Sequence, residues 1–396
     1  MSDRYDLIVI GAGISGLAMA FEAKQAGMNV LVLEKEARVG GCFESATVES
    51  ETPFWLEMGT HTCFNSYGRL LKILEQLGLM DQLTAREKLR YKMLADDSLV
   101  SIPSRLSFFE LFSNAWRIFS AKKEGRSVAD YYGAIVGAKN YHNVFRHAFN
   151  AVLCQQADDV PSEMLFRKRP RDKKVMRSYT FPEGLGRIIS ELEQQVACRK
   201  GVAIDAITFS EAEGFSVQIG DETLAADKLA CAAPVLATSR LLKAAFPKIS
   251  EQLAWVAEVE IESVGIVVNR ADLALDAVAG IIAVDGDFYS SVSRDFIDHP
   301  QYRGMTFHFK PGQLDQGQKI ERICKLLDLD ASKLQRVFYK TNRLPSPDMG
   351  HDSVIAKVDE LLAGKPLALV GNYFEGVAVE DCLARVESEF QRLSQK

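Results

Sequence analysis

The hydrophobic positions at the start of the chain are continuous rather than alternating. Leu7-Ile8-Val9-Ile10 is one apolar run, and Val30-Leu31-Val32-Leu33 is a second. Runs of this kind are typical of parallel strands that are buried on both faces. A helical stretch from Leu17 to Lys24 lies between them, and Gly27 marks its end. The pattern therefore predicts a β-α-β unit.

Helical periodicity is clearest at the end of the chain. Apolar residues follow one another at intervals of four, three, four and three residues, which places them on one helix face: Val379, Leu383, Val386, Phe390 and Leu393. Glu380 and Asp381 fall in the first turn, where the helix dipole favours acids. Two more helices are expected, over residues 66–79 and from residue 185 to 196.

The middle of the chain predicts both helices and strands. Residues 80–180 have a mostly helical and aromatic pattern. Alternating or apolar runs predict strands in five places: 203–209, 215–219, 228–233, 264–268 and 305–309.

Composition narrows the class of protein. A chain of 396 residues with 47% hydrophobic content can bury more than one core, so two domains are expected. The net charge of −6 gives no sign of the excess of basic residues that is typical of nucleic-acid-binding proteins. No apolar run is long enough to span a membrane, and a strand that begins near residue 5 leaves no room for a signal peptide.

The cysteines indicate the cellular compartment. The seven cysteines are scattered and include no Cys-x-x-Cys pair. This spacing predicts reduced thiols in a cytoplasmic protein rather than disulfides or a zinc site, and we expect no bound metal.

A glycine motif follows the first predicted strand. It reads Gly11-Ala12-Gly13-Ile14-Ser15-Gly16, in which Gly11 permits a tight turn, Gly13 a close approach to phosphate and Gly16 close helix packing. The N–H groups at the helix start would face the anion. Glu34 lies 21 residues after Gly13, close to the offset of roughly 20 at which an acid reaches a ribose hydroxyl. Together these features predict a dinucleotide site.

The residues after Glu34 resemble a known superfamily. The continuation Lys35-Glu36-Ala37-Arg38-Val39-Gly40-Gly41 is similar to the Glu-(about five)-Gly-Gly extension of flavin amine oxidases, phytoene desaturases and protoporphyrinogen oxidases. The resemblance implies that the paired glycines approach the pyrophosphate. The superfamily generally has Arg or Lys after them, and here Cys42 departs from that pattern. Arg38 is either a phosphate contact or a solvated surface arginine.

The tail resembles the protoporphyrinogen oxidase branch. That branch reads Pro-x-x-x-x-Gly-His, then Gly-Asn, then Gly-Val-x-x-x-Asp-Cys-Ile. The matching segments are Pro345 to His351, Gly371-Asn372 and Gly376-Val377-Ala378 continuing to Leu383. The resemblance implies that the tail holds the flavin end of FAD, bound noncovalently, with Cys382 in a structural role.

The resemblance covers nearly the whole chain and implies an α/β fold. A Rossmann-like FAD-binding domain would comprise 1–65, 185–240 and 350–396, with a discontinuous α+β substrate domain at 66–184 and 241–349. Glu57-Met58-Gly59-Thr60-His61 resembles the segment that passes beneath the flavin. The positions expected to contact FAD are Gly11, Ala12, Gly13, Ile14, Ser15, Gly16, Glu34, Lys35, Arg38, Gly40, Gly41, Cys42, Met58, Gly59, Thr60, Gly371, Asn372, Gly376, Val377 and Ala378.

The implied activity is flavin-based oxidation. No nucleophile or metal cluster stands out, which suits a reaction carried by a cofactor. The resemblance implies hydride transfer to flavin N5 and reoxidation by oxygen or another electron acceptor. We expect dehydrogenation of a hydrophobic cyclic or conjugated small molecule. Amine oxidation and a non-catalytic flavin-binding subunit remain alternatives.

Catalytic residues are not predicted. His61, His308 and Tyr373 are candidate polar groups near the ring, and for each histidine a structural role is the alternative. Lys310 is a candidate for the lysine that amine oxidases place near N5, or is a surface lysine. Candidate pocket walls are aromatic: Tyr179, Tyr339, Tyr373 and Phe374.

Two segments in the middle leave several interpretations open. Residues 108–119 are rich in aromatic and aliphatic side chains, and could form a core helix, a substrate channel or a helix at a membrane surface. Residues 167–177 contain seven basic residues, which suit a solvated loop or a site for lipid head groups or substrate carboxylates. Peripheral membrane contact is therefore one of the expectations.

Overall fold

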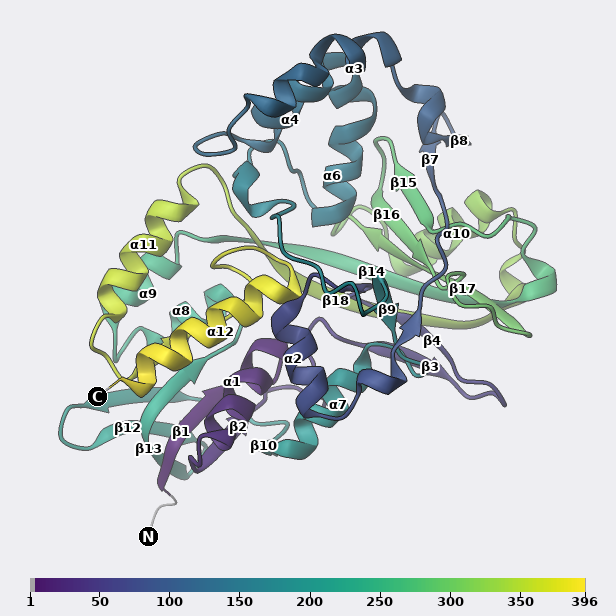
Figure 1. The fold of residues 1–396 in the computed structure, drawn as a ribbon. Helices are drawn as coiled ribbons and strands as arrows, with labels where there is room; N and C mark the ends of the chain where they lie inside the picture. Colours follow the sequence, from purple (N-terminus) through teal and green to yellow (C-terminus); the bar gives the residue numbers. More distant parts are fainter. Residues whose placement is uncertain (1–3, 396) are drawn as a thin grey trace.

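The computed structural model describes residues 4–395, which form two large sheets with helices around them (Figure 1). The first sheet has the order β10-β2-β1-β13-β12-β11, with β19 beside β13. Its parallel strands are β1 (Arg4–Ile10), β2 (Val30–Leu33), β10 (Ala197–Arg199), β13 (Glu222–Cys231) and β19 (Leu367–Leu369). Its antiparallel strands are β11 (Ala206–Ser210) and β12 (Gly214–Ile219).

Helices cover both faces of this sheet. Leu7 and Val9 of β1 pack into one hydrophobic cluster, and Ile8 and Ile10 pack into the other. This is why the strand is apolar at every position. The first cluster includes side chains of α1 (Ile14–Gln25), α2 (Gly68–Gln76), α7 (Gly186–Gln195) and α12 (Val379–Ser394). The second includes side chains of α8 (Val235–Leu242), α9 (Pro247–Leu253) and α11 (His351–Leu362).

The second sheet has the order β18-β14-β17-β16-β15-β7-β8. Its strands are β7 (Tyr91–Ala95), β8 (Ser98–Ser101), β14 (Ala257–Asn269), β15 (Gly280–Ala283), β16 (Phe288–Ser293), β17 (Tyr302–Phe309) and β18 (Leu334–Ser346). On one face Phe307 and Phe309 pack against α10 (Gln316–Leu327) in a third cluster. The other face carries Thr306 and His308, because side chains alternate along a strand.

A helical cap stands above this sheet, at the top of Figure 1. It comprises the helices α3 (Phe108–Asn114), α4 (Val128–Val136), α5 (Ala138–Asn140) and α6 (Arg146–Leu153), with a π-helical turn at Tyr141–Phe145 and 3₁₀ turns at Ile102–Arg105, Ala115–Phe119 and Ser162–Met164. Other 3₁₀ turns lie at Met80–Gln82, Arg270–Asp272 and Ala331–Lys333. Short strands complete the fold: β3 (Ser45–Val48), β4 (Phe54–Glu57), β5 (Cys63–Phe64), β6 (Thr84–Ala85) and β9 (Ser178–Thr180).

The α/β fold class and the individual elements expected from the sequence are confirmed, with one correction. Residues 80–180 are not mostly helical, because β7 and β8 form one edge of the second sheet and β6 and β9 pair near the first. The predicted domain boundaries stay a prediction. Hydrophobic side chains of α2, which follow the first boundary at residue 65, pack in the cluster around α1.

Candidate cofactor site

Of the three glycines in the glycine loop, Gly13 borders free space. Gly11 has a positive φ of 96°, and a Cβ on Gly16 would lie 1.9 Å from the carbonyl oxygen of Gly11. By contrast, a Cβ on Gly13 would meet nothing within 4 Å. Helix α1 starts here with no side-chain cap and no acid in its first turn. The first N–H groups of the helix are therefore available to an anion.

Glu34 lies against this loop. It follows β2, and its Oε2 accepts a hydrogen bond from the backbone N–H of Ala12 at 2.7 Å. Its Oε1 accepts another from the backbone N–H of Glu36 at 2.9 Å. The carboxylate thus fixes the turn and stands at the edge of the loop, where the sequence places a ribose.

The paired glycines run beside the first loop. The backbone N–H of Gly40 donates to the carbonyl of Ala12 at 2.8 Å, and Gly40 and Gly13 form a parallel bridge. Arg38 is not a freely solvated surface arginine. Its guanidinium donates to the carbonyl of Gly41 at 2.8 Å and pairs with Glu44 at 2.9 Å. Arg38 therefore holds the loop shape. Lys35 is exposed.

The tail reaches the same place from the other end of the chain. Helix α12 also begins without a side-chain cap, and Cys382 in its first turn shares a hydrogen bond with Ser15 of α1. The two helix N-termini are therefore neighbours, as Figure 1 shows for α1 and α12. Burial raises the pKa of Cys382 to about 12, so it stays a thiol.

The Gly350-His351 motif supports the tail loop. The imidazole of His351 is buried, and its Nε2–H donates to the carbonyl of Tyr373 at 2.7 Å. Gly371 and Gly376 have φ values of 147° and 151°, which glycine adopts most readily. The loop between β19 and α12 is thus held from α11.

Acids of the tail bind other parts of the chain. Glu380 is buried and accepts the backbone N–H of Arg69 at 3.1 Å, at the start of α2. Asp381 pairs with Arg169. Arg167 pairs with Glu375 at 2.8 Å. Two residues of the basic run therefore bind the tail, whereas the other five are exposed: Lys168, Arg171, Lys173, Lys174 and Arg177.

The segment Glu57 to His61 lies against the paired glycines. The backbone N–H of Thr60 donates to the carbonyl of Cys42 at 2.9 Å, and a Cβ on Gly59 would lie 2.2 Å from the same oxygen. Met58 is held from β18, because the side-chain amide of Asn342 donates to its carbonyl at 2.9 Å. This segment therefore joins the paired-glycine loop to the second sheet.

Glu57 itself has a structural role. Its carboxylate is buried and accepts the backbone N–H of Leu185 at 2.7 Å and the hydroxyl of Ser45 at 2.9 Å. Burial nevertheless raises its pKa to about 7, and the two hydrogen bonds oppose that change. The predicted helix after Leu185 starts at this carboxylate.

The two candidate histidines form a pair. Nε2 of His61 lies 2.9 Å from Nε2 of His308, and Nδ1 of His308 lies 3.1 Å from the hydroxyl of Ser263. Burial lowers the pKa of His308 to about 4, and burial and nearby positive charges lower the pKa of His61 well below its usual value. Both imidazoles are therefore neutral near pH 7, and one Nε2 donates to the other.

A lysine near the loop was missed by the sequence analysis. Lys340 of β18 lies opposite Ser263 of β14, and its Nζ donates to the carbonyl of Gly41 at 2.8 Å. The same Nζ pairs with Glu44 at 3.0 Å, and burial lowers its pKa. A cation thus stands beside Cys42, the position where the superfamily generally has Arg or Lys.

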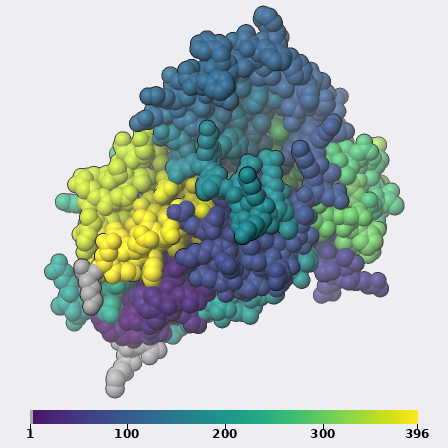
Figure 2. Space-filling model, viewed as in Figure 1, coloured from purple at the N-terminus to yellow at the C-terminus, as the bar shows by residue number. Residues whose placement is uncertain are grey.

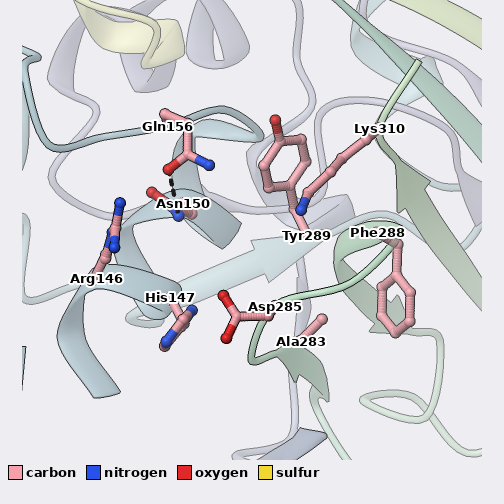
Figure 3. A pocket seen from close by; sticks show the side chains of 9 residues that line it. All are labelled: Arg146, His147, Asn150, Gln156, Ala283, Asp285, Phe288, Tyr289 and Lys310. Atoms are coloured by element: carbon pink, nitrogen blue, oxygen red, sulfur yellow. Dashed lines mark hydrogen bonds between the residues drawn. The ribbon is translucent and has the colours of Figure 1, made fainter. Parts of the chain in front are cut away.

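Lys310, the lysine named from the sequence, lies elsewhere. Its Nζ donates to the carbonyl of Gly286 beside the ring of Tyr289. It lines a small cavity of about 70 Å³ between α6 and the hairpin of β15 and β16 (Figure 3). The other lining residues are mainly polar: Arg146, His147, Asn150, Gln156, Ala283, Asp285, Phe288 and Tyr289. A second cavity, of about 10 Å³, is lined by Glu57, His61 and the apolar side chains of Trp55 and Phe296, among others.

The candidate aromatic walls do not gather around the histidine pair. Tyr373 and Phe374 are buried in the cluster under α8 and α11. Tyr179 is fully buried in the cluster around α1. Tyr339 is exposed and neighbours Lys340 in β18, so it lies on the opposite face of that strand.

The first part of the chain matches proteins of known family. Residues 9–77 match the NAD(P)-binding Rossmann-like domain. The flavin-containing amine oxidase of Danio rerio is 35% identical over 99 residues, which are 25% of this chain and 17% of that protein. Flavin-containing amine oxidase B of Homo sapiens is 35% identical over 79 residues, which are 20% of this chain and 15% of that protein. The match therefore spans less than a fifth of these relatives.

Solved structures match the whole fold. A protein assigned as a protoporphyrinogen oxidase from Exiguobacterium sp. 255-15 has a TM-score of 0.77 at 18% identity and covers 100% of both chains. A conjugated linoleic acid-producing fatty acid isomerase from P. acnes has a TM-score of 0.75 at 16% identity, covering 99% of both chains. A putrescine oxidase variant has a TM-score of 0.73 at 13% identity, covering 98% of this chain and 99% of its own.

Within residues 4–395 no helix is both long and apolar enough to cross a membrane.

The likenesses to known proteins agree with the site geometry. The N-terminal match falls on the strand, glycine loop and acid described above, and the structural match extends through the tail. Over its first quarter the chain is therefore similar in sequence to flavin-containing amine oxidases, and over its whole length its fold is like those of the solved protoporphyrinogen oxidase-like and putrescine oxidase structures.

Proposed function

We propose that the protein is an FAD-dependent oxidoreductase that binds its cofactor noncovalently. One observation carries this proposal: the N-termini of α1 and α12, both uncapped, meet through Ser15 and Cys382 beside the paired glycines. The terminus of α1, which has no acid in its first turn, favours an anion such as a pyrophosphate, whereas the first turn of α12 holds Glu380 and Asp381 and would offer its backbone N–H groups to the flavin end. The space at Gly13, which a methyl group could enter, fits a close-approaching phosphate.

The residues that would hold FAD follow a continuous line of contacts. Glu34 would bind the adenine-side ribose, and the backbone of Gly13 to Gly16 and of Gly40-Gly41 would bind the pyrophosphate. Thr60 and the start of α12 would lie along the flavin end. Noncovalent binding is supported by the raised pKa values of the Cys42 and Cys382 thiols, because a thiol is a weaker nucleophile than a thiolate.

When bound, FAD supplies a hydride acceptor at N5 and returns the electrons to oxygen or another acceptor. The chain would contribute the histidine pair. Neutral His61 can accept the proton that leaves the substrate, and His308 and Ser263 are aligned to share it through the contacts at 2.9 and 3.1 Å. Hydride loss and proton loss together amount to a two-electron dehydrogenation.

The charges around this pair favour a neutral substrate. Arg86 donates to the carbonyl of His61 at 2.7 Å, and Lys340 adds a second cation nearby. Of the acids, Glu57 is occupied by Leu185 and Ser45, and Glu44 is paired with Arg38 and Lys340. A cationic amine would gain no carboxylate here. We therefore favour a hydrophobic cyclic or conjugated molecule that loses hydrogen from C–C or C–N bonds.

Amine oxidation is the second candidate. It is favoured by the N-terminal matches, which are to flavin-containing amine oxidases. The polar cavity between α6 and the sheet, with Asp285 and Tyr289 in its wall, could receive a polar substrate (Figure 3).

The experiment is anaerobic mixing of the FAD-loaded protein with porphyrinogens, polyenes and amines. An enzyme's substrate bleaches the visible absorbance band of the oxidised flavin, a property of flavin itself. Bleaching by hydrophobic conjugated compounds supports the first candidate, and bleaching by amines alone supports the second. A protein that keeps its flavin and is reduced by dithionite but by no compound of the panel would instead be a flavin-binding scaffold for a partner.

We also propose that any membrane contact is peripheral. Large apolar side chains are exposed on the helical cap, whereas no described helix could span a bilayer. A cytoplasmic location remains a prediction from the cysteines, all of which are free.

A further inference from the structure

The helical cap carries an exposed apolar segment. Residues 108–119, which we call the apolar crest, form α3 and the 3₁₀ turn after it at the top of Figure 1. Phe109, Phe112 and Phe119 are 84%, 80% and 92% exposed. Phe108, Trp116 and Ile118 are also more than half exposed. The interpretation of this segment as a core helix is therefore wrong for every large apolar residue except Leu111, which packs inside the cap.

The exposed side chains follow the spacing of their helical segments. Phe109 and Phe112 are three residues apart in α3, and Trp116 and Phe119 are three residues apart in the 3₁₀ turn that follows, so each pair shares a face of its own segment. Exposed single hydrophobic residues are normal on proteins, but a contiguous patch marks an interaction surface. In Figure 2 the blue segments that include the crest form the projecting top of the molecule.

The crest is fixed to the cap from below. The backbone N–H of Ser107 donates to the side-chain oxygen of Asn140 at 2.7 Å. The carboxylate of Glu110 accepts the backbone N–H groups of Lys139 and Asn140 at 3.1 and 2.9 Å. Glu110 therefore faces the protein and caps α5, while the phenylalanine rings face outward.

The surroundings of the crest are basic, although the whole chain carries a net charge of −6. Arg117, Lys122 and Arg126 are exposed within or just after the crest. Lys123 donates to the carbonyl of Leu165 at 2.6 Å, which joins the crest to the start of the basic run. We call this set the basic collar: Arg117, Lys122, Lys123, Arg126 and Lys168. Glu124 is the exposed acid in residues 108–126 of the described chain, and two more exposed acids lie close by: Asp130 in α4, and Glu163, whose charge acts on Lys123.

We propose that the crest docks on the surface of an anionic phospholipid bilayer. The aromatic rings would enter the boundary between head groups and acyl chains, and the basic collar would lie against lipid phosphates. A second copy of the chain is a poorer occupant, because crest-to-crest packing would oppose two basic collars. The inference deepens the proposed peripheral contact, and it does not depend on bound flavin.

Tryptophan fluorescence gives a direct test. Of the three tryptophans, Trp55 is buried, Trp116 lies in the crest and Trp255 is exposed outside the cap. In the Trp255→Phe protein, Trp116 is the solvent-facing reporter. Vesicles of phosphatidylcholine with phosphatidylglycerol should shift its emission to the blue, and salt should weaken the shift. The double variant Trp255→Phe/Trp116→Phe should show no shift.

Vesicle sedimentation with crest variants completes the test. Substitution of Phe109, Phe112 and Phe119 by serine should weaken binding at least about tenfold while the protein keeps its FAD. Trp255→Ser, which removes an apolar side chain that is 75% exposed elsewhere on the protein, should bind as the wild type does. The proposal is overturned if the wild type ignores anionic vesicles at low salt, if the triple variant binds equally well, or if the crest only drives concentration-dependent dimers. Loss of FAD from every protein would count against the proposed function, not against the crest.

Discussion

Replacement of Gly13 by alanine should separate cofactor binding from folding. Gly13 has φ −73° and ψ 178°, a conformation that alanine adopts without strain, and its added methyl would meet no atom of the chain within 4 Å. The free energy of unfolding of the apoprotein should therefore stay constant or rise by about 0.4–1 kcal/mol, because alanine restricts the unfolded chain. If the space belongs to a pyrophosphate, the same methyl must displace it.

Overpacking of a close contact typically costs about 1–3 kcal/mol, so Gly13→Ala should weaken FAD binding by about 5- to 150-fold. Titration of apoprotein with FAD, followed by quenching of flavin fluorescence, gives the affinity, and thermal unfolding of the apoprotein gives the stability. Gly133→Ala is the matched control: it lies in α4 of the cap, and its methyl would make only an ordinary contact with the ring of Tyr141 at 3.8 Å. Wild-type FAD affinity in Gly13→Ala would refute the assignment of this opening to the pyrophosphate.

Three further substitutions test the surroundings of the site. Lys340→Met removes the cation beside Cys42 and the hydrogen bond to Gly41. FAD affinity should therefore fall about tenfold in the same titration, with little change in the far-UV circular dichroism spectrum. Unchanged affinity would show that Lys340 has only a structural role. Glu57 prefers its protonated form in the folded state, so stability should decline by about 3 kcal/mol as pH rises from its ordinary pKa of 4.5 to about 7. Glu57→Gln should abolish this decline in urea unfolding across that range, and a persisting slope would assign it to another group. His351→Ala breaks the hydrogen bond to the carbonyl of Tyr373 and should lower the free energy of unfolding by about 1–3 kcal/mol in the same assay. An unchanged midpoint of urea unfolding would show that the tail loop does not depend on His351.

The parts of the fold that the sequence predicted are those with local causes. Leu7 to Ile10 is apolar at every position because alternate residues enter the two clusters on either side of the sheet. The closing helix follows its apolar stripe, and the glycine motif forms the predicted loop. In each case, neighbouring residues carried enough information.

The parts that the sequence missed depend on long-range register. His61 and His308 were separate candidates because nothing local shows that β17 brings one within 2.9 Å of the other. Lys340 reaches Gly41 only through its pairing opposite Ser263 in the second sheet. Alternation along β18 places Lys340 and Asn342 on a common face. This was the one signal in the sequence that could have linked Lys340 to the site.

The apolar crest shows a different limit. Its helical spacing was readable, but periodicity states only that the apolar residues share a face, not whether that face points inward. Leu111 alone faces the core of the cap, while Phe109 and Phe112 face solvent. The mixture of exposed aromatic and basic residues in one segment was compatible with all three interpretations until the structure fixed the direction.

Cofactor content of the purified protein tests the central claim most directly. We predict a yellow protein whose absorbance is that of oxidised flavin, and which releases one FAD per chain into solution when it is denatured. Apoprotein should take up FAD, but not FMN, to the same stoichiometry, because the site near Glu34 and Gly13 is built for the adenine half. A colourless protein that binds no added FAD, or a flavin that stays attached to the denatured chain, would contradict the account.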